Sequence, residues 1–143
     1  MWYGEYKHTL DSKDRCILPS KYRDKIKKLK VKKFYLTRGL DGCLFLFTLE
    51  VWSELEKKLN SLSFTKQQTR FFNRLYFSGA HELEIDTQGR MTIPTYLKEF
   101  AGIKKEVVII GIADRVEIWD RERWEKFYAD NRKRFEEMAE GLF

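Results

Sequence analysis

The sequence contains the same segment twice, and this internal repeat constrains the possible folds more than any other feature. Residues 4–23 read GEYKHTLDSKDRCILPSKYR and residues 79–98 read GAHELEIDTQGRMTIPTYLK, and they align without a gap at an offset of 75 positions. Four aligned positions are identical and five more carry similar residues. The repeat predicts two copies of one structural unit.

Both copies share the pattern apolar–Asp–Ser/Thr–x–x–Arg–x–x–apolar–Pro–Ser/Thr. The similarity continues downstream, where Trp52 stands five residues after Phe47 and Trp124 stands five residues after Trp119. The offset there is 72, so the second copy is shorter by three residues in between. Each copy therefore extends from the first shared glycine to a closing helix.

Each copy is predicted to form a strand, a turn, a second strand, a short helix and two further strands. These elements are expected at 5–10, 15–18, 20–29, 34–37 and 43–47, and again at 81–85, 90–93, 95–101, 106–110 and 116–119. Ser20 and Thr95 stand where N-caps of the short helices are expected. The closing helices are expected to begin near Thr48 and Asp120.

The turns between the first two strands read Asp11-Ser-Lys-Asp14 and Asp86-Thr-Gln-Gly89. Aspartate side chains accept hydrogen bonds from nearby backbone N–H groups, so Asp11 and Asp86 are expected to fix these turns. Asp14 and Gly89 occupy the position at which a positive φ is expected. All four residues are therefore predicted to be structural.

One such unit is too small to bury a core of its own, so two units are expected to share one. The predicted organisation is unit 1 at 5–47, a helical connector at 48–78, unit 2 at 79–119 and a C-terminal helix at 120–143. Within a linking helix at 65–77, an apolar stripe recurs at helical spacing (Phe71, Phe72, Leu75 and Tyr76). This stripe either faces the β part as core or packs on another subunit, together with a face of the 120–139 helix.

The net charge of +6 is concentrated in the first copy. Residues 7–33 hold eleven basic and three acidic residues, a net charge of +8, whereas residues 81–106 hold four basic and five acidic residues, a net charge of −1. A basic balance favours a polyanionic partner such as DNA, so the first copy is expected to make most of the contact. The alternative is that residues 25–33 form an ordinary solvated helix and loop.

Signatures of other functional classes are missing. Cys16 and Cys43 stand in apolar runs and are expected to be buried free thiols, while His8 and His81 do not occupy equivalent positions. No Gly-rich phosphate loop, nucleophile elbow or two-histidine zinc motif occurs, so we expect no enzymatic activity, cofactor, metal or small-molecule substrate. No apolar run matches a signal peptide or a membrane span, which predicts a cytoplasmic protein without membrane contact.

The segments Asp11–Pro19 and Asp86–Pro94 resemble the SpoVT-AbrB family of swapped-hairpin DNA-binding proteins. Two such copies over essentially all of a 143-residue chain resemble the tandem-unit transcriptional regulators of that family. The resemblance implies an α+β fold in which two AbrB-like units interleave into one small swapped-hairpin β-barrel with peripheral helices. Asp14 and Gln88 depart from the family pattern, which commonly has Gly and Lys at these positions.

The resemblance also implies ring-shaped homo-oligomers that bind short direct repeats in double-stranded DNA. Those repeats lie upstream of the division and cell-wall gene cluster, which includes the regulator's own gene, and this implies association with the nucleoid. The predicted DNA-binding residues are Lys7, Lys13, Arg15, Lys21 and Arg90. Arg15 is expected to reach a guanine edge, and Lys13, Lys7 and Lys21 are expected to meet phosphates.

Several alternatives remain at this point. In one alternative, Arg90 pairs with Asp86 or Glu84 instead of contacting a nucleotide. In another, Arg15 has a purely structural role. At the level of function, the alternatives to a regulator are an antitoxin-like protein that pairs with a toxin and a ring-forming scaffold without specific DNA binding. Steep salt dependence of DNA binding would distinguish the regulator from the scaffold.

Overall fold

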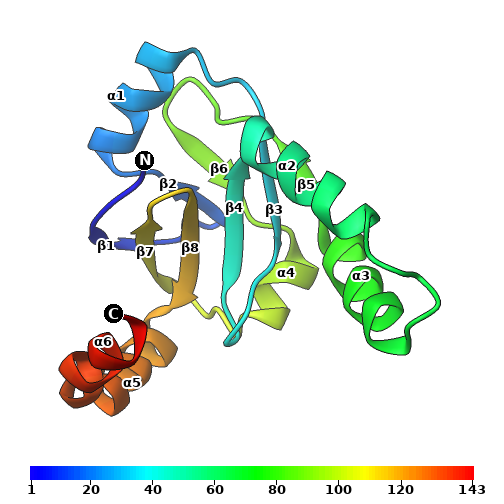
Figure 1. Cartoon of the computed structure of the whole chain (residues 1–143). Helices are drawn as coiled ribbons and strands as arrows, with labels where there is room; N and C mark the ends of the chain where they lie inside the picture. The colour runs from blue at the N-terminus through cyan, green and yellow to red at the C-terminus, as the bar shows by residue number, and fades with distance from the viewer.

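The computed structural model describes residues 1–143 and has the predicted α+β fold (Figure 1). The first half contains β1 (Glu5–Thr9), β2 (Arg15–Ile17), α1 (Ser20–Leu29), β3 (Phe34–Arg38), β4 (Leu44–Thr48), α2 (Leu49–Asn60) and α3 (Gln67–Gly79). The second half contains β5 (His81–Leu83), β6 (Arg90–Thr92), α4 (Thr95–Phe100), β7 (Glu106–Ile112), β8 (Arg115–Asp120), α5 (Arg121–Asn131), the 3-10 turn η1 (Arg132–Arg134) and α6 (Phe135–Leu142). Both halves follow the element order that the repeat predicts.

Strands of the first unit pair with strands of the second. A six-stranded antiparallel sheet has the order β1-β7-β8-β4-β3-β5, and a second sheet pairs β2 with β6. β1 of the first unit therefore pairs with β7 of the second, and β5 of the second unit pairs with β3 of the first. In the β2–β6 ribbon, Cys16 lies opposite Met91, its equivalent 75 positions further on. Each pairing of a first-unit strand with a second-unit strand thus has its equivalent with the units interchanged.

Both units contribute to one main core of 19 buried residues. Equivalent positions of the two units both belong to it, such as Cys16 and Met91, and Leu18 and Ile93. Cys16 and Cys43 are both buried and free, as expected, and burial raises the pKa of the Cys16 thiol to about 12. Because the units share this core, the two turns that follow β1 and β5 are held by one rigid body.

The N-caps of α1 and α4 are Pro19 and Pro94, and the prediction of Ser20 and Thr95 as caps is wrong. Each proline has the φ near −60° that its ring imposes and an extended ψ, and no side chain caps either helix. The proline carbonyls accept the first helical N–H bonds, so Ser20 and Thr95 are the first helical residues. The bounds predicted for the first short helix, 20–29, are confirmed.

Most of the other elements differ by one or two residues from their predicted bounds, and three differences stand out. β5 ends at Leu83, two residues before the predicted end, and the linking helix covers Gln67–Gly79 instead of 65–77. The C-terminal segment is not one helix, because η1 separates α5 from α6. None of the helices has both the length and the apolar character that crossing a bilayer requires.

The remaining helices lie at two ends of the six-stranded sheet (Figure 1). α2 and α3 pack beside β3 and β4 through Trp52 and Tyr76, and α5 packs beside β7 and β8. Within the predicted α3 stripe only Tyr76 is buried, whereas Phe71, Phe72 and Leu75 are 50%, 40% and 62% exposed. The interpretation of the stripe as core therefore holds for Tyr76 alone.

Candidate nucleic-acid interface

The turn between β1 and β2 is built around the Asp11 carboxylate. Its Oδ1 accepts hydrogen bonds of 2.9 Å from the backbone N–H groups of Lys13 and Arg15, and its Oδ2 accepts one of 2.7 Å from Arg15 Nε. The hydrogen bond from the Arg15 N–H, with the others, lowers the pKa of Asp11 to about 2. Asp14 closes the turn with a φ of 57°.

The turn between β5 and β6 has the same geometry. Asp86 Oδ1 accepts 2.9 Å hydrogen bonds from the N–H groups of Gln88 and Arg90, and Oδ2 accepts one of 2.8 Å from Arg90 Nε. The hydrogen bond from the Arg90 N–H is the main reason why the pKa of Asp86 is also lowered. Gly89 takes the αL position with a φ of 78°.

Both arginines are fixed through Nε and keep their terminal nitrogens available. Arg15 and Arg90 each pair with the aspartate four residues earlier, and neither makes a hydrogen bond through Nη1 or Nη2. Their side chains are 27% and 28% exposed. The expected alternative, pairing of Arg90 with Asp86, is thus present, and Arg15 has the same pairing. A guanidinium oriented in this way presents two parallel donors to an acceptor.

These arginines lie on the outer face of the β2–β6 ribbon. Arg15 lies opposite Thr92, and Ile17 lies opposite Arg90, so all four side chains share one face. Ile17 is 37% exposed and Thr92 is also exposed, whereas the central pair between them is buried on the inner face. The ribbon therefore offers a short exposed surface with an arginine near each end.

Each turn is tied to the second strand of the other unit. The Asp14 carbonyl accepts a 2.9 Å hydrogen bond from the Ile93 N–H, and the Gly89 carbonyl accepts one of 2.8 Å from the Leu18 N–H. These bonds extend the ribbon beyond its three paired residues at both ends. The spacing between the two turns is consequently set by backbone hydrogen bonds.

The helix after each ribbon strand places a cation on the opposite turn. Lys98 of α4 donates a 2.9 Å hydrogen bond to Asp14 Oδ1 in the first turn. Arg23 of α1, the residue equivalent to Lys98, lies against Gly89 in the second turn, where a Cβ would overlap its side chain. Gly89 has no carboxylate, so the Arg23 cation is not neutralised as Lys98 is, and its buried Nε has no hydrogen-bond partner.

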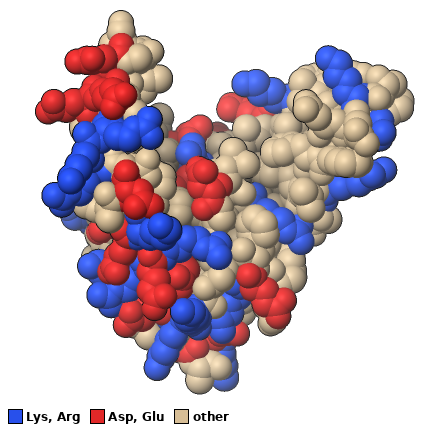
Figure 2. Space-filling view, turned by 90° about the horizontal axis from the view of Figure 1, so that it is seen from below, with Lys and Arg blue, Asp and Glu red and all other residues tan.

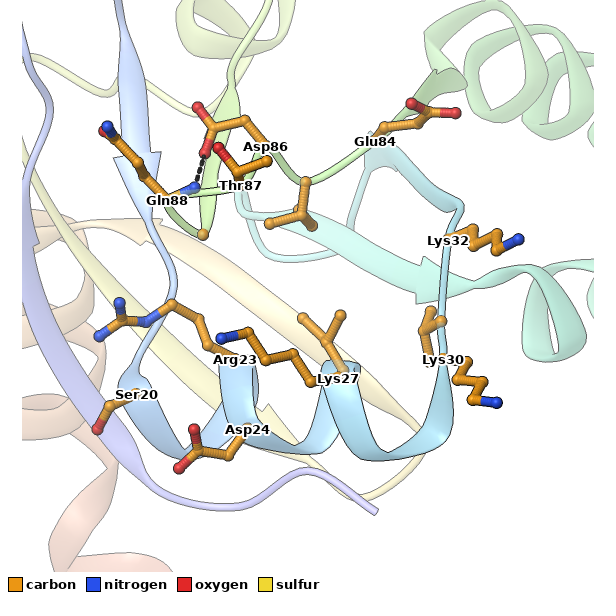
Figure 3. A pocket seen from close by; sticks show the side chains of 14 residues that line it. Ser20, Arg23, Asp24, Lys27, Lys30, Lys32, Glu84, Asp86, Thr87 and Gln88 are labelled. Carbon is orange, nitrogen blue, oxygen red and sulfur yellow. Dashed lines mark hydrogen bonds between the residues drawn. The ribbon is translucent and has the colours of Figure 1, made fainter.

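A groove of about 540 Å³ lies between α1 and the 84–89 segment (Figure 3). Its basic residues are Arg23, Lys27, Lys30 and Lys32, and its acidic residues are Asp24, Glu84 and Asp86. All four basic residues belong to the first unit, yet they lie beside the turn of the second. Because the units pair their strands with each other, basic residues of the first unit lie beside both turns. The net charge of each copy, counted separately, does not predict this arrangement.

The other sequence-predicted residues lie around this ribbon. Lys13 is exposed in the first turn, and Lys7 on β1 lines a shallow hollow together with Ile17 and Arg23. Lys21 is exposed in the first turn of α1, in a separate hollow near the N-terminus of the chain. Sequence reasoning missed Ile17, Thr92 and Arg23 as surface residues of this region. The signal for Arg23 was its alignment with Lys98, a second cation at the equivalent position.

No cluster of three or more His, Cys, Asp or Glu side chains is arranged to hold a metal ion. The carboxylates nearest the ribbon, Asp11 and Asp86, are occupied by backbone N–H groups and arginines. The chemistry that the region offers is thus hydrogen-bond donation by fixed arginines and attraction of anions by neighbouring lysines.

Comparison with known proteins agrees with the repeat. The family described as "MraZ protein, putative antitoxin-like" matches residues 1–75 and again residues 76–143. A protein named transcriptional regulator MraZ from Acetivibrio thermocellus is 50% identical over 142 residues, which cover 99% of this chain and 96% of the relative. The protein of the same name from Finegoldia magna is 47% identical over 142 residues with the same coverage. Because the family matches both halves and the relatives match nearly full length, the chain belongs to the MraZ family.

Proposed function

We propose that the protein is a DNA-binding transcription regulator whose β2–β6 ribbon enters the major groove. The observation that carries the proposal is the outer face of the ribbon, where Arg15 and Arg90 are fixed by their aspartates with both terminal nitrogens unpaired. The major groove admits a two-stranded ribbon, and arginine paired twice with a guanine is the commonest specific contact. The relatives' name, transcriptional regulator, supports the same function.

The outer residues of the ribbon take different roles in this proposal. Arg15 reads a guanine, and Arg90 takes the equivalent position at the other end of the ribbon. Ile17 and Thr92, exposed between them, suit contact with thymine methyl groups. Lys13, exposed at the tip of the first turn, binds a phosphate.

The surrounding cations supply affinity that does not depend on sequence. Arg23 and Lys27 bind phosphates beside the second turn, and Lys7 and Lys21 bind phosphates at the flanks. Each phosphate that a cation neutralises releases condensed counterions, so binding weakens steeply as salt rises. Aspartates 11 and 86 keep the turns in shape and do not touch DNA.

The assembled regulator is proposed to be a ring that places several ribbons on short direct repeats. The pairing of β1 with β7 and of β5 with β3 supports the interleaved, swapped-hairpin barrel that the AbrB-like motif implies. A ring on several repeats gains affinity through effective concentration, by about 10²–10⁴ over one repeat. We place these repeats upstream of the division and cell-wall gene cluster and of the regulator's own gene, in the nucleoid.

Fluorescence anisotropy on a duplex from the protein's own upstream region tests this function. Wild type and Arg15→Ala are titrated at two salt concentrations, beside a scrambled duplex of equal length. The regulator is expected to prefer its own duplex and to lose affinity with salt, and Arg15→Ala is expected to lose the preference while keeping its assembly state. Equal binding of wild type to both duplexes, or binding to neither, would contradict the regulator proposal and favour the scaffold alternative.

The family description favours an antitoxin-like role as a second candidate. Such a protein holds a toxin protein while it binds DNA, and an exposed apolar surface is available at α3. Co-expression with the product of the neighbouring gene, followed by measurement of the mass of the purified complex, tests this role. A stable complex of defined stoichiometry supports it, and a mass that contains only this chain excludes that gene product as its toxin.

A further inference from the structure

The groove between α1 and the 84–89 segment is lined by basic side chains that have no partner within the protein. None of them takes part in an ion pair (Arg23, Lys27, Lys30 and Lys32). Elsewhere charges are more evenly matched, since on the side opposite α1 basic and acidic residues lie next to one another (Figure 2). Of the acidic residues in the groove, Asp86 is already held by Arg90. The groove therefore has an excess of unpaired positive charge.

An additional turn of α1 places two of these cations together. α1 has ten residues, whereas α4, the equivalent helix of the second unit, has six. The additional turn carries Lys27, four residues after Arg23, so both side chains lie on the same side of the helix. They lie side by side between α1 and the second turn (Figure 3). In the second unit the residue four positions after Lys98 is Gly102, so only the first unit has this pair of cations.

The first turn shows what the second turn lacks. Asp14 Oδ1 accepts a 2.9 Å hydrogen bond from Lys98, so the protein itself supplies an anion to the cation that covers the first turn. The second turn has Gly89 at the equivalent position, and Arg23 lies against it with a buried Nε that has no hydrogen-bond partner. An anion that supplies the missing negative charge beside Arg23 has to come from outside the protein.

The rest of the groove suits the organic part of a ligand. Ile26, Val31 and Ile85 line it and pack against the main core, so they give it fixed apolar surface. Glu84 is exposed and has no ion-pair partner, and a carboxylate of this kind accepts hydrogen bonds from sugar hydroxyl groups. The volume of about 540 Å³ is typical of a site for a small molecule. A ligand with both phosphate and hydroxyl groups therefore fits this lining better than a simple anion.

We propose that this groove binds an organic diphosphate, such as a nucleoside diphosphate, and that the bound ligand competes with DNA. The two linked phosphates contact Arg23 and Lys27, and a sugar hydroxyl donates a hydrogen bond to Glu84, farther along the groove (Figure 3). The competition rests on the proposed function, in which Arg23 and Lys27 bind DNA phosphates. The ligand site itself does not rest on it. By linkage, DNA and the ligand each lower the affinity of the protein for the other.

Isothermal titration calorimetry without DNA tests the ligand site. ADP, inorganic pyrophosphate and adenosine are titrated into wild type at equal ionic strength. ADP is expected to bind with one molecule per chain, pyrophosphate more weakly, and adenosine more weakly than either. Lys27→Ala is expected to weaken ADP binding by about tenfold, the value of one hydrogen bond to a charged group. Lys28→Ala, on the exposed surface of α1 outside the groove, is the matched control and is expected to leave the affinity unchanged.

Three results of the calorimetry would overturn the proposal. These are the absence of saturable ADP binding, equal losses of affinity in Lys27→Ala and Lys28→Ala, and equal affinities for pyrophosphate and ADP. Equal losses would show that ADP meets the basic surface without a defined site. Equal affinities would show that the groove holds an inorganic anion and makes no use of the organic part. Circular dichroism checks that both variants keep the fold, which is expected because both side chains are exposed.

Glu84→Gln tests the contact with the organic part. It removes a negative charge from the groove, so pyrophosphate is expected to bind more tightly. The hydrogen bond from the sugar hydroxyl loses its charged acceptor, which offsets this gain for ADP. The ratio of ADP affinity to pyrophosphate affinity is therefore expected to fall. Glu56→Gln, exposed on α2, is the control, and a ratio that stays the same or rises in Glu84→Gln would contradict the contact.

Fluorescence anisotropy tests the competition with DNA. Wild type and Lys27→Ala are titrated onto the protein's own duplex and a scrambled duplex, with ADP or with sodium chloride of equal ionic strength. ADP is expected to weaken binding of wild type to both duplexes, and to do so less in Lys27→Ala. Unchanged DNA affinity at saturating ADP would overturn the competition. Normal ADP binding by a protein that binds no DNA would refute the proposed function and leave the ligand site intact, whereas normal DNA binding without ADP binding would refute the ligand site alone.

Discussion

The two turns of the β2–β6 ribbon have the same hydrogen bonds but different cations around them. In each, one aspartate holds two backbone N–H groups and the Nε of an arginine. In the first turn Lys98 is neutralised by Asp14, whereas in the second turn Arg23 lies on Gly89 without a carboxylate. The residues that the two copies share therefore set the backbone of both turns. The charge around each turn depends on single residues that differ between the copies, at the tip of the turn and on the helix that lies against it.

Arginine replacement is expected to give the largest difference between the turns. Arg15→Ala is expected to reduce the preference for the protein's own duplex by about 10- to 100-fold, the value of one bidentate contact. Arg90→Ala is expected to cost less overall affinity than Arg15→Ala, because Arg23 and Lys27 keep their phosphates beside that turn. Anisotropy titrations of both variants against specific and scrambled duplexes measure the two losses. A greater loss for Arg90→Ala would reverse the assignment of the turns.

Exchange of the tip residues is expected to affect stability unequally. Gly89→Asp puts a Cβ at a φ of 78° and into the Arg23 side chain, so it is expected to destabilise the fold by about 1–2 kcal/mol. Asp14→Gly removes an ion pair that is partly exposed, and its effect is expected to stay within about 1 kcal/mol. Urea unfolding of both variants measures the difference. Equal midpoints would show that Arg23 does not constrain the second turn.

The phosphate contacts are expected to appear as changes in salt dependence. Arg23→Ala is expected to weaken binding to specific and scrambled duplexes alike and to reduce the slope of log affinity against log salt by about 1. Asp14→Gly is expected to do the opposite, because Lys98 is then free to meet a phosphate. Binding isotherms at four salt concentrations give both slopes. A loss of sequence preference in Arg23→Ala would instead indicate a base contact.

The pH dependence of the first turn is expected to be the smallest effect. The folded state lowers the pKa of Asp11 from 3.8 to about 2, so the ionised carboxylate stabilises the turn above pH 4. That stability is lost as the pH falls from about 4 through about 2, when the carboxylate is protonated. The difference in urea midpoint between wild type and Asp11→Asn is therefore expected to shrink over this range. Glu54→Gln, on the exposed surface of α2, is the control.

Local features of the fold follow directly from the sequence. The repeat predicts the element order, the turn at Asp11–Asp14 and the positive φ of Asp14 and Gly89, all of which the structure contains. These features depend on neighbouring residues, whose chemistry the sequence displays. The extent of α1, 20–29, was predictable for the same reason.

Features that depend on distant contacts were not predictable in the same way. Which helix covers which turn is decided by the strand pairing between the units, so the position of Arg23 beside Gly89 cannot be inferred from their separation in the chain. The periodicity of Phe71, Phe72 and Leu75 marks an apolar face but does not distinguish a core from a surface between subunits. In both cases the sequence pattern predicts which residues share a face of an element. It does not predict which part of the molecule, or which other molecule, packs against that face.

Site-directed cleavage of DNA tests most directly whether the ribbon lies in the major groove. An iron chelate is attached to single cysteines introduced by Ile17→Cys, Thr92→Cys and, in the exposed α2–α3 loop, Leu62→Cys. The native thiols Cys16 and Cys43 are buried, and burial raises the pKa of both, so they stay unlabelled. Cleavage within the direct repeats is expected from both ribbon positions and not from the loop. Cleavage from Leu62→Cys, with none from the ribbon positions, would contradict the proposed binding surface.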